Sequence, residues 1–276
     1  MDFNVLNIVI PVLLLIGVGV ISAVVLTLAN VFFGVKEDET AVAIRDCLPG
    51  ANCGACGYSG CDGYAKALAE KSTSATNLCI PGGADVAKQI ASILGTDAGD
   101  VVAQVAYVAC NGTCEAAQKK YEYQGKKSCR AANMAYGGEK LCTYACLGYG
   151  DCVAVCPQDA ITIENGVAKV DSTKCIGCGI CARECPNSII HLVNETSSVV
   201  VACSNHDKGA VTRKACSNGC IGCMKCQKTC PHGAITVVNN LATINYDLCT
   251  GCGACADVCP VHCIHKENFV CGTTLN

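Results

Sequence analysis

Cysteines recur at short, fixed spacings near the C-terminal end of the chain. Two segments have the pattern C-x2-C-x2-C-x3-C-P, so each offers four thiols followed by a proline. The thiols are Cys220, Cys223, Cys226 and Cys230 in the first segment, and Cys249, Cys252, Cys255 and Cys259 in the second. Thiolates at such spacings bind zinc or iron–sulfur clusters, but a zinc site of this kind needs only two CxxC pairs. The third and fourth thiols, with the proline that follows, therefore favour iron–sulfur chemistry.

A segment of this pattern divides its ligands between two clusters. The first three cysteines hold one [4Fe–4S] cluster, and the fourth holds the neighbouring cluster. The sequence therefore predicts two adjacent clusters that exchange one ligand each. The expected ligands are Cys220, Cys223, Cys226 and Cys259 for one cluster, and Cys249, Cys252, Cys255 and Cys230 for the other.

A further group of four thiols lies in the N-terminal part of the chain, with the spacing C-x2-C-x4-C-x17-C. It consists of Cys53, Cys56, Cys61 and Cys79 and is sufficient for one more [4Fe–4S] cluster. Glycines between the first three cysteines allow the backbone to bend closely around a cluster. Apolar residues at helical spacing predict a helix over residues 62–71, and Asp85 after a Pro-Gly-Gly turn predicts a second helix that ends at Leu94.

An internal repeat precedes the C-terminal cysteine segments. Residues 156–163 recur as residues 230–237, 74 positions later. The same offset relates Cys175, Cys178, Cys181 and Cys185 to Cys249, Cys252, Cys255 and Cys259. Each copy predicts a β-hairpin, over 161–170 and over 235–245, because short β-branched runs flank an Asn-Gly or Asn-Asn turn. We therefore expect two ferredoxin-like modules in tandem.

The first module departs from the regular cysteine spacing. Its first segment reads C-x3-C-x5-C-x3-C-P, and Tyr149 stands where the offset would place a match for Cys223. We therefore expect Cys142 to be the replacement ligand. The expected ligands are Cys142, Cys146, Cys152 and Cys185 for one cluster, and Cys175, Cys178, Cys181 and Cys156 for the other.

Eight of the 28 cysteines lie outside these five sets: Cys47, Cys110, Cys114, Cys129, Cys203, Cys216, Cys263 and Cys271. Cys110 and Cys203 each end a Val-Ala-Cys triplet, and each precedes a second cysteine, Cys129 and Cys216 respectively. These two pairs could close a sixth cluster between the modules. The alternative, four free thiols, stays open. The offset of 74 also relates Cys142 to Cys216 and Cys129 to Cys203.

The N-terminal segment is apolar and uncharged from residue 3 to residue 35. Its residues 8–28 are long enough to cross a hydrocarbon core of roughly 30 Å as a helix. A signal peptide would begin with basic residues and have a shorter apolar region, so we expect a retained anchor. Lys36 and Arg45 follow the span, which places the bulk of the chain on the cytoplasmic side. Clusters with thiolate ligands also require a reducing compartment.

Other features of the sequence restrict the functions that it can have. The net charge of −3 gives no indication of nucleic-acid binding. There is no phosphate-binding loop and no catalytic triad, so we expect no catalytic residues and no bound flavin or NAD. A basic stretch carries Lys119, Lys120, Lys126, Lys127 and Arg130. It is either a solvated surface or a docking site for an acidic redox protein such as ferredoxin.

Three segments in combination resemble the B subunits of the Rnf complex family: LPGANCGACGYSGC (48–61), CLGYGDC (146–152) and GCIGCMKCQKTCP (219–231). The first segment alone is also similar to part of the corrinoid iron–sulfur protein. The resemblance implies a membrane-bound ferredoxin:NAD oxidoreductase that translocates sodium ions or protons. It implies that this subunit takes electrons from soluble ferredoxin and passes them to membrane and NAD-binding Rnf subunits, at the bacterial inner (plasma) membrane. Relatives that keep a transcription factor's iron–sulfur cluster reduced are the alternative.

The expected fold is α+β, with an N-terminal transmembrane helix, a small α-helical [4Fe–4S] domain and two tandem bacterial-type two-cluster ferredoxin modules. The expected boundaries are 1–35 for the single-pass anchor, 36–97 for the four-cysteine domain, 98–140 for a linker, 141–196 for the first module, 197–215 for a connecting segment and 216–276 for the second module. Five [4Fe–4S] clusters are expected, and a sixth is left open. The sequence does not identify the coupling ion, the direction of electron flow or the order of electron transfer between clusters.

Overall fold

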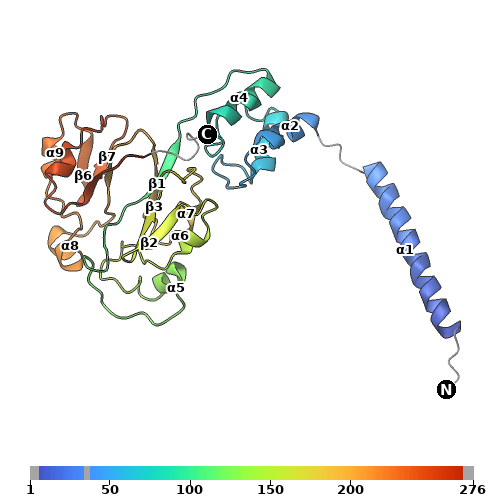
Figure 1. Cartoon of the computed structure of the whole chain (residues 1–276), viewed down its shortest axis with the longest axis horizontal. Helices are drawn as coiled ribbons and strands as arrows, with labels where there is room; N and C mark the ends of the chain where they lie inside the picture. The colour runs from blue at the N-terminus through green and yellow to red at the C-terminus, as the bar shows by residue number, and fades with distance from the viewer. Residues whose placement is uncertain (1–5, 34–37, 270–276) are drawn as a thin grey trace.

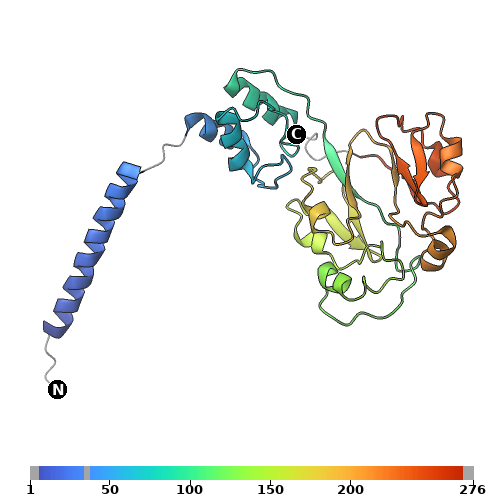
Figure 2. The same cartoon turned by 180° about the vertical axis from the view of Figure 1, so that it is seen from behind.

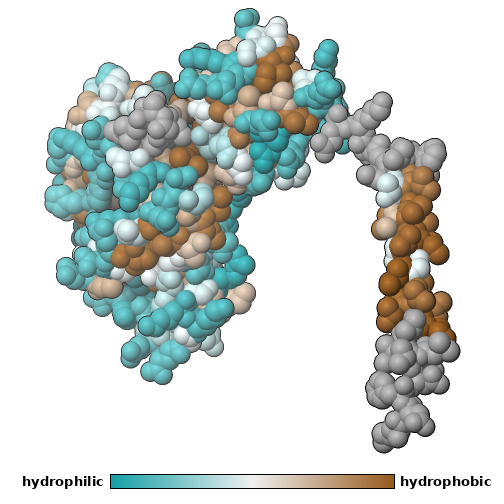
Figure 3. Space-filling view, turned by 45° about the vertical axis from the view of Figure 1, so that its right-hand side comes forward, coloured by the Kyte–Doolittle hydropathy of each residue, from teal (hydrophilic) through white to brown (hydrophobic). Residues whose placement is uncertain are grey.

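A single long helix stands apart from the rest of the protein. The computed structural model describes residues 6–33 and 38–269, and helix α1 (Leu6–Phe33) extends away from the globular part (Figures 1 and 2). Within it, Val12–Ala29 has a mean hydropathy of 2.8 and packs against nothing in the protein. Figure 3 shows this helix as a hydrophobic rod beside a largely hydrophilic globular part. Its length and composition are those of a membrane-crossing helix, as the sequence predicts.

Three helices form a small helical domain after α1. They are α2 (Glu39–Cys47), α3 (Cys61–Ala69) and α4 (Gly83–Leu94). The carboxylate of Asp38 accepts a hydrogen bond from the Thr40 N–H (2.9 Å), which satisfies a free donor at the start of α2. Ile44, Tyr64 and Ile90 supply one buried side chain from each helix to a common core. The two helices that the sequence predicts here are confirmed within two residues at each end.

The first of two similar α+β units follows the helical domain. Its elements are β1 (Gln104–Val108), α5 (Cys129–Met134), α6 (Asp151–Ala154), β2 (Ile161–Glu164), β3 (Val167–Val170), α7 (Ile180–Glu184) and β4 (Ile190–Asn194). Strands β1 and β4 pair antiparallel, with Ala106 opposite Leu192. Strands β2 and β3 form the predicted hairpin, whose turn residues Asn165 and Gly166 both have positive φ, as a tight two-residue turn requires.

The second unit repeats this arrangement. Its elements are β5 (Val199–Val201), α8 (Gly209–Ala215), α9 (Lys225–Thr229), β6 (Ile235–Val238), β7 (Leu241–Ile244), α10 (Ala254–Asp257) and β8 (Ile264–Lys266). The terminal strands β5 and β8 pair, and β6 and β7 form the second predicted hairpin. The core of each unit consists of apolar strand residues together with cysteines.

Each unit begins earlier in the chain than the sequence predicts. Strand β1 lies in the expected linker 98–140, and β5 lies in the expected connecting segment 197–215, yet each pairs with the last strand of its own unit. These two segments are therefore part of the folded units. The sequence-based boundaries are wrong here because both strands are short and their partners lie far along the chain, where no local pattern marks the pairing.

The two units contact each other through residues that precede their first cysteine segments. Ala117 forms a β-bridge with Cys216. The Ser204 hydroxyl donates to the carbonyl oxygen of Ala109 (2.9 Å), and the Asn218 amide donates to that of Asn111 (3.1 Å). The helical domain contacts the first unit, where the Arg183 guanidinium on α7 donates to the carbonyl oxygen of Cys53.

Candidate metal centres

The helical domain brings together the four thiols that the sequence predicts. We call Cys53, Cys56, Cys61 and Cys79 the helical-domain set. The pKa of the Cys79 thiol is raised to about 11, mainly by burial and also by the neighbouring thiols of Cys61, Cys53 and Cys56. The loop before α3 is held where the Cys61 N–H donates to Asn52 Oδ1 (2.9 Å). Gly60 has a φ of +135°, and a Cβ there would lie 2.9 Å from that Asn52 oxygen, so only glycine fits without a shift of Asn52.

The first unit also assembles one predicted set without change. Cys156, Cys175, Cys178 and Cys181, here the Cys156 set, line a small cavity whose other walls are mainly apolar. The N–H groups of Ala106 and Ala160 point at the sulfurs of Cys175 (3.5 Å) and Cys156 (3.3 Å). The pKa of Cys181 is raised to about 12, mainly by burial and also by the other three thiols of the set. Four such thiols become thiolates together only when bound cations compensate their charge.

A second small cavity in this unit differs from the expectation. Its lining thiols are Cys129, Cys146, Cys152 and Cys185, here the Cys129 set. The cysteine spacing predicts Cys142 in this set, but Cys142 does not line this cavity. Burial raises the pKa of Cys152 to about 12, followed by the effects of Cys146 and Cys129. Cys129, from the expected linker, therefore takes the position that Tyr149 leaves without a thiol.

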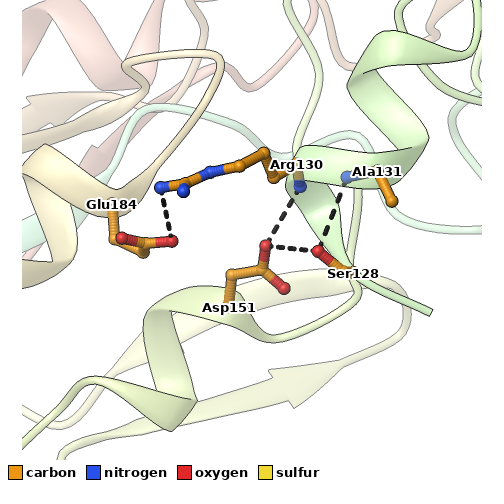
Figure 4. Close-up of polar contacts among 5 residues, drawn as sticks. All are labelled: Ser128, Arg130, Ala131, Asp151 and Glu184. Carbon is orange, nitrogen blue, oxygen red and sulfur yellow. Dashed lines mark hydrogen bonds and ion pairs between the residues drawn. The ribbon is translucent and has the colours of Figure 1, made fainter. Parts of the chain in front are cut away.

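Polar contacts around α5 explain why Cys129 reaches this cavity (Figure 4). Asp151 accepts hydrogen bonds from the Ser128 hydroxyl (2.9 Å) and from the Arg130 N–H (3.0 Å), and the Arg130 guanidinium pairs with Glu184 (3.0 Å). Asp151 precedes Cys152, and Glu184 precedes Cys185. The residues on both sides of Cys129 are thus fastened to residues next to two other thiols of the set.

The charge state of Asp151 supports this arrangement. Burial would raise the pKa of its carboxyl group, but hydrogen bonds from the Arg130 and Cys129 N–H groups and from Ser128 outweigh burial and hold the pKa below its usual value. The carboxylate therefore stays ionised near neutral pH. Hydrogen bonds to a charged acceptor are among the stronger ones in proteins, so this contact fixes the start of α5 firmly.

A third small cavity lies where the two units meet. Cys110, Cys142, Cys203 and Cys216 line it, and we call them the junction set. The sequence suggests Cys129 for this set, whereas the structure places Cys142 there. The N–H groups of Cys146 and Gly112 point at the Cys110 sulfur (3.3 and 3.4 Å), and those of Cys220 and Asn205 point at the Cys203 sulfur (3.2 and 3.5 Å).

The junction set is nearly symmetric between the units. Cys110 and Cys203 both closely follow the first strand of their units, and Cys142 and Cys216 are related by the repeat offset. Asn205 breaks the symmetry: it is only 1% exposed, and its side-chain amide donates to the Cys142 sulfur (3.3 Å). No sequence signal indicated this role for Asn205.

The second unit brings together thiols that the sequence predicts for each of two clusters. We call Cys220, Cys223, Cys226 and Cys259 the Cys220 set. The pKa of Cys226 is raised to about 11, mainly by burial and also by Cys220, Cys223 and Cys259. Burial also raises the pKa of Cys255, whose thiol neighbours are Cys249 and Cys230. Together with the exposed Cys252, these three form the Cys249 set.

A fifth buried thiol contacts the Cys220 set. Cys263 is only 1% exposed, and its sulfur lies 3.6 Å from that of Cys259. Hydrogen bonding by the Cys263 thiol lowers the pKa of Cys259 to about 5 and also lowers that of Cys220. The same position, four residues after the Cys-Pro cysteine, holds Ala160, Ile189 or Ala234 in the other segments. Cys47 and Cys114 line none of the cavities described above, and Cys271 lies outside the described residues.

The geometry of the sets suits a polynuclear cluster. Among the described residues, no three His, Cys, Asp or Glu side chains converge closely enough to hold a single metal ion. In the Cys156, Cys129 and junction sets the thiols instead surround small, mainly apolar cavities, and backbone N–H groups point at the sulfurs. Four soft thiolate donors around such a space match the four irons of a [4Fe–4S] cubane, each iron taking one ligand.

The structure does not gather the expected basic stretch into one free patch. Lys119 pairs with Glu139 (3.1 Å), Arg130 pairs with Glu184, and the Lys120 ammonium donates to the carbonyl oxygen of Tyr136 (2.6 Å). Lys126 and Lys127 are exposed and form no ion pair with any residue that the structure describes.

Family models match three parts of the chain. Residues 48–81 match a model described as an Fe-S cluster, residues 168–191 match a 4Fe-4S binding domain, and residues 214–266 match a 4Fe-4S dicluster domain. These ranges contain the helical-domain set and the cysteines of both C-terminal segments, so they agree with the chemistry that the thiols indicate.

Curated relatives align with almost the whole chain. The B subunit of the Na(+)-translocating ferredoxin:NAD(+) oxidoreductase complex of Acetobacterium woodii is 48% identical over 94% of this chain and 78% of its own length. The B subunit of the proton-translocating ferredoxin:NAD(+) oxidoreductase complex of Clostridium ljungdahlii is 42% identical over 94% and 91%. The B subunit of the ion-translocating oxidoreductase complex of Methanosarcina acetivorans is 38% identical over 89% and 93%.

Proposed function

The chain belongs to the family of B subunits of ion-translocating ferredoxin:NAD(+) oxidoreductase complexes, the Rnf complexes, and from this we propose how its thiol sets carry electrons. It is an electron-transfer subunit of an oxidoreductase complex and contains several 4Fe-4S domains. We propose that it holds six [4Fe–4S] clusters, one in each of the six sets, within one helical domain and two tandem two-cluster modules. The sixth cluster occupies the junction set.

The observation that carries this proposal is that the six sets follow one another in space. Cys53 of the helical-domain set is close enough to Cys178 of the Cys156 set to raise its pKa, after the larger effect of burial. In the same way, Cys181 of the Cys156 set is among the thiols that raise the pKa of Cys152 in the Cys129 set.

The second half of the path crosses between the units. The N–H of Cys146 in the Cys129 set donates to Cys110 of the junction set (3.3 Å), and the N–H of Cys220 donates to Cys203 (3.2 Å). The Cys220 and Cys249 sets then exchange ligands through α9. The path therefore runs from the Cys249 set through the Cys220, junction, Cys129 and Cys156 sets to the helical-domain set. Without the junction set, the two units would have no cluster between them.

The protein's own residues set the conditions for this transfer. When bound, the clusters accept and release single electrons. The chain holds the cysteines at fixed positions, shields them from water with apolar strand residues and directs N–H groups at their sulfurs. Burial and N–H···S hydrogen bonds are the means by which proteins adjust cluster potentials. No proton transfer or covalent catalysis is required, so no catalytic side chain is assigned.

We place electron entry at the second unit. Cys223 and Cys252 are exposed there, and Lys225 and Lys228 on α9 are exposed and form no ion pair among the described residues. This surface suits an acidic soluble ferredoxin, because complementary charge accelerates association. It replaces the basic stretch 119–130 as the docking site. Electrons leave from the helical domain, which directly follows α1 in the sequence.

We place the globular part on the cytoplasmic side of the membrane, with α1 as a single-pass anchor. Lys36 and Arg45 follow the apolar segment, and no basic residue precedes it. No ionisable residue lies between residues 3 and 35, so ion translocation belongs to partner subunits. The names of the relatives include both Na(+) and proton complexes, so they do not identify the ion.

Two measurements test this function. Anaerobically purified protein should contain about 24 irons per chain, at four per cubane, whereas five clusters would give about 20. Membranes that lack this subunit should regain ferredoxin-driven NAD+ reduction when the full-length chain is supplied. Zinc in place of iron would contradict the cluster assignment. Failure to regain NAD+ reduction with fully loaded protein would favour the reductase for a transcription factor's cluster.

A further inference from the structure

Lys140 is a buried cation without a protein counter-charge. Its residue is only 3% exposed, and its ammonium donates to the carbonyl oxygens of Gly112 (2.7 Å) and Gly166 (2.8 Å). Among the described residues it forms no ion pair with a carboxylate. The other lysines and arginines are at least partly exposed in the described part of the chain.

Such a residue is unfavourable unless negative charge lies nearby. A buried ammonium loses its hydration, and two neutral carbonyl groups supply only partial compensation. A charge of this kind persists in a folded protein when an opposite charge is held close to it. The protein residues around Lys140 do not provide one, so the compensation must come from the groups that its surroundings bind.

The two carbonyl partners connect Lys140 to two different thiol sets. Gly112 lies in the loop of Cys110, and the Gly112 N–H donates to the Cys110 sulfur of the junction set (3.4 Å). Gly166 lies in the β2–β3 turn, and Ala168 in the same hairpin donates its N–H to the Cys146 sulfur of the Cys129 set (3.4 Å). Lys140 therefore lies between the two sets.

The positive charge of Lys140 lies close to both the Cys129 set and the junction set. The two carbonyl groups that accept from its ammonium belong to backbone segments whose N–H groups donate to the sulfurs of Cys146 (3.4 Å) and Cys110 (3.4 Å). One of these thiols belongs to the Cys129 set and the other to the junction set. A [4Fe–4S] cluster with four thiolate ligands is negatively charged, and it becomes more negative when it takes up an electron. A fixed positive charge at this place would therefore favour the reduced state of both clusters.

We propose that Lys140 is the shared internal counter-charge of the Cys129 and junction clusters, and that it raises the reduction potentials of these two clusters relative to their values without it. The inference rests on the proposed function, since it needs both clusters to be present. Lys140 acts through the field of its ammonium group. The two clusters at the crossing between the units then hold an electron more readily, which favours transfer from one unit to the other.

The test is a redox titration of the full-length protein in detergent under anaerobic conditions. Lys140→Gln retains a hydrogen-bond donor for the two carbonyls and removes the charge. Two of the six one-electron steps should shift to more negative potential, while the other four should stay in place. Lys169→Gln is the matched control, because Lys169 is exposed, lies on the same hairpin and pairs with Glu164 (2.7 Å). The control should shift none of the steps.

A second variant covers the case in which Lys140→Gln fails to bind all its clusters. Cys114 is exposed, and both its sulfur and the Lys140 nitrogen lie next to Gly166. A Cβ atom built on Gly166 would be 2.6 Å from the sulfur and 3.8 Å from the nitrogen, so the two groups are close to each other. Cys114→Asp would place a carboxylate beside the ammonium without removing it. We expect shifts of the same two steps in the same direction, but smaller.

The outcomes separate this inference from the proposed function. Wild-type protein with about 24 irons, together with unchanged steps in a fully loaded Lys140→Gln or Cys114→Asp variant, would overturn the role of Lys140 alone. A wild-type iron content that lacks the junction cluster would instead contradict the proposed function. A shift spread evenly over all six steps would also overturn the inference, because it would show a general effect on the fold.

Discussion

The exchange of Cys129 and Cys142 between two thiol sets gives a sharp prediction. The structure places Cys129 with Cys146, Cys152 and Cys185, and it places Cys142 with Cys110, Cys203 and Cys216. Replacing either cysteine by alanine should remove one cluster and lower the iron content from about 24 to about 20 per chain. The single variants give the same number, so pairs of variants are needed to identify the partners.

Double variants distinguish the two assignments by iron content alone. If Cys142 and Cys110 serve the same cluster, Cys142→Ala combined with Cys110→Ala should still retain about 20 irons. If Cys142 and Cys152 serve different clusters, that combination should retain only about 16. Effects of residues in one site are not additive, whereas those of separate sites are. Iron and acid-labile sulfide are measured on protein that is purified and kept without oxygen.

The opposite pattern would refute the ligand assignment. A value of about 20 irons for Cys142→Ala with Cys152→Ala, and about 16 for Cys142→Ala with Cys110→Ala, would restore the assignment based on spacing alone. Cys114→Ala is the control, because Cys114 is exposed and lines neither cavity. It should retain the wild-type iron content.

Three further predictions concern residues around the clusters. Cys263→Ala should shift the Cys220-set cluster to more negative potential in a redox titration, since a thiol donor to its sulfurs is lost. Asp151→Ala removes the hydrogen bonds that Ser128 and Arg130 donate to a charged acceptor, each worth about 1.5–3 kcal/mol, so thermal unfolding should occur at lower temperature. Because the folded pKa of Asp151 lies below its ordinary value of 3.8, this stabilisation is present above that pH and is lost on acidification. Reversing the charges of Lys225 and Lys228 should slow reduction by ferredoxin in stopped-flow measurements and weaken its salt dependence.

Each of these predictions has a contradicting result. An unchanged potential in Cys263→Ala would show that the buried thiol is only a packing residue. An unchanged unfolding temperature and iron content in Asp151→Ala would mean that Cys129 is positioned by other contacts. If reversing Lys126 and Lys127 slows ferredoxin reduction, and reversing Lys225 and Lys228 does not, then electrons enter near α5 and the proposed docking face is wrong.

Local spacing predicted the parts of the fold in which neighbouring residues act together. The Cys-Pro segments, both hairpins and the helices after Cys61 and Gly82 all follow from patterns within a few residues of each other. The grouping of the thiols in the second unit also follows, because the x3-C-P step carries the chain from one thiol set to the next. These features depend on geometry that a short segment of chain determines.

Local spacing could not predict which cysteine takes the place of the thiol that is missing at Tyr149 in the first unit. Cys129 reaches its cavity through Asp151 and Glu184, which belong to helices distant in the sequence. No spacing rule applies to a ligand supplied across a tertiary contact. A signal was present, however: the repeat offset relates Cys142 to Cys216, and the Val-Ala-Cys triplets relate Cys110 to Cys203. Internal symmetry of the junction set would have indicated the four cysteines that line this cavity.

The sequence also did not predict which charged side chains are buried or paired. Lys140 follows Glu139 in a polar segment and has the sequence context of a surface residue, yet it is buried between two thiol sets. Arg130 and Lys119 stand in a basic stretch with few acidic neighbours, yet both are paired. Where a long charged side chain ends depends on the partners that the fold brings to it.

The central claim is that the junction cluster is an obligatory step between the two units, and Cys142→Ala tests it most directly. This variant should lose about four irons, keep the clusters of the second unit reducible by ferredoxin, and fail to support ferredoxin-driven NAD+ reduction in membranes that contain the other subunits. If instead the variant loses the junction cluster and still supports NAD+ reduction at the wild-type rate, electrons do not pass through the junction and the proposed path is wrong.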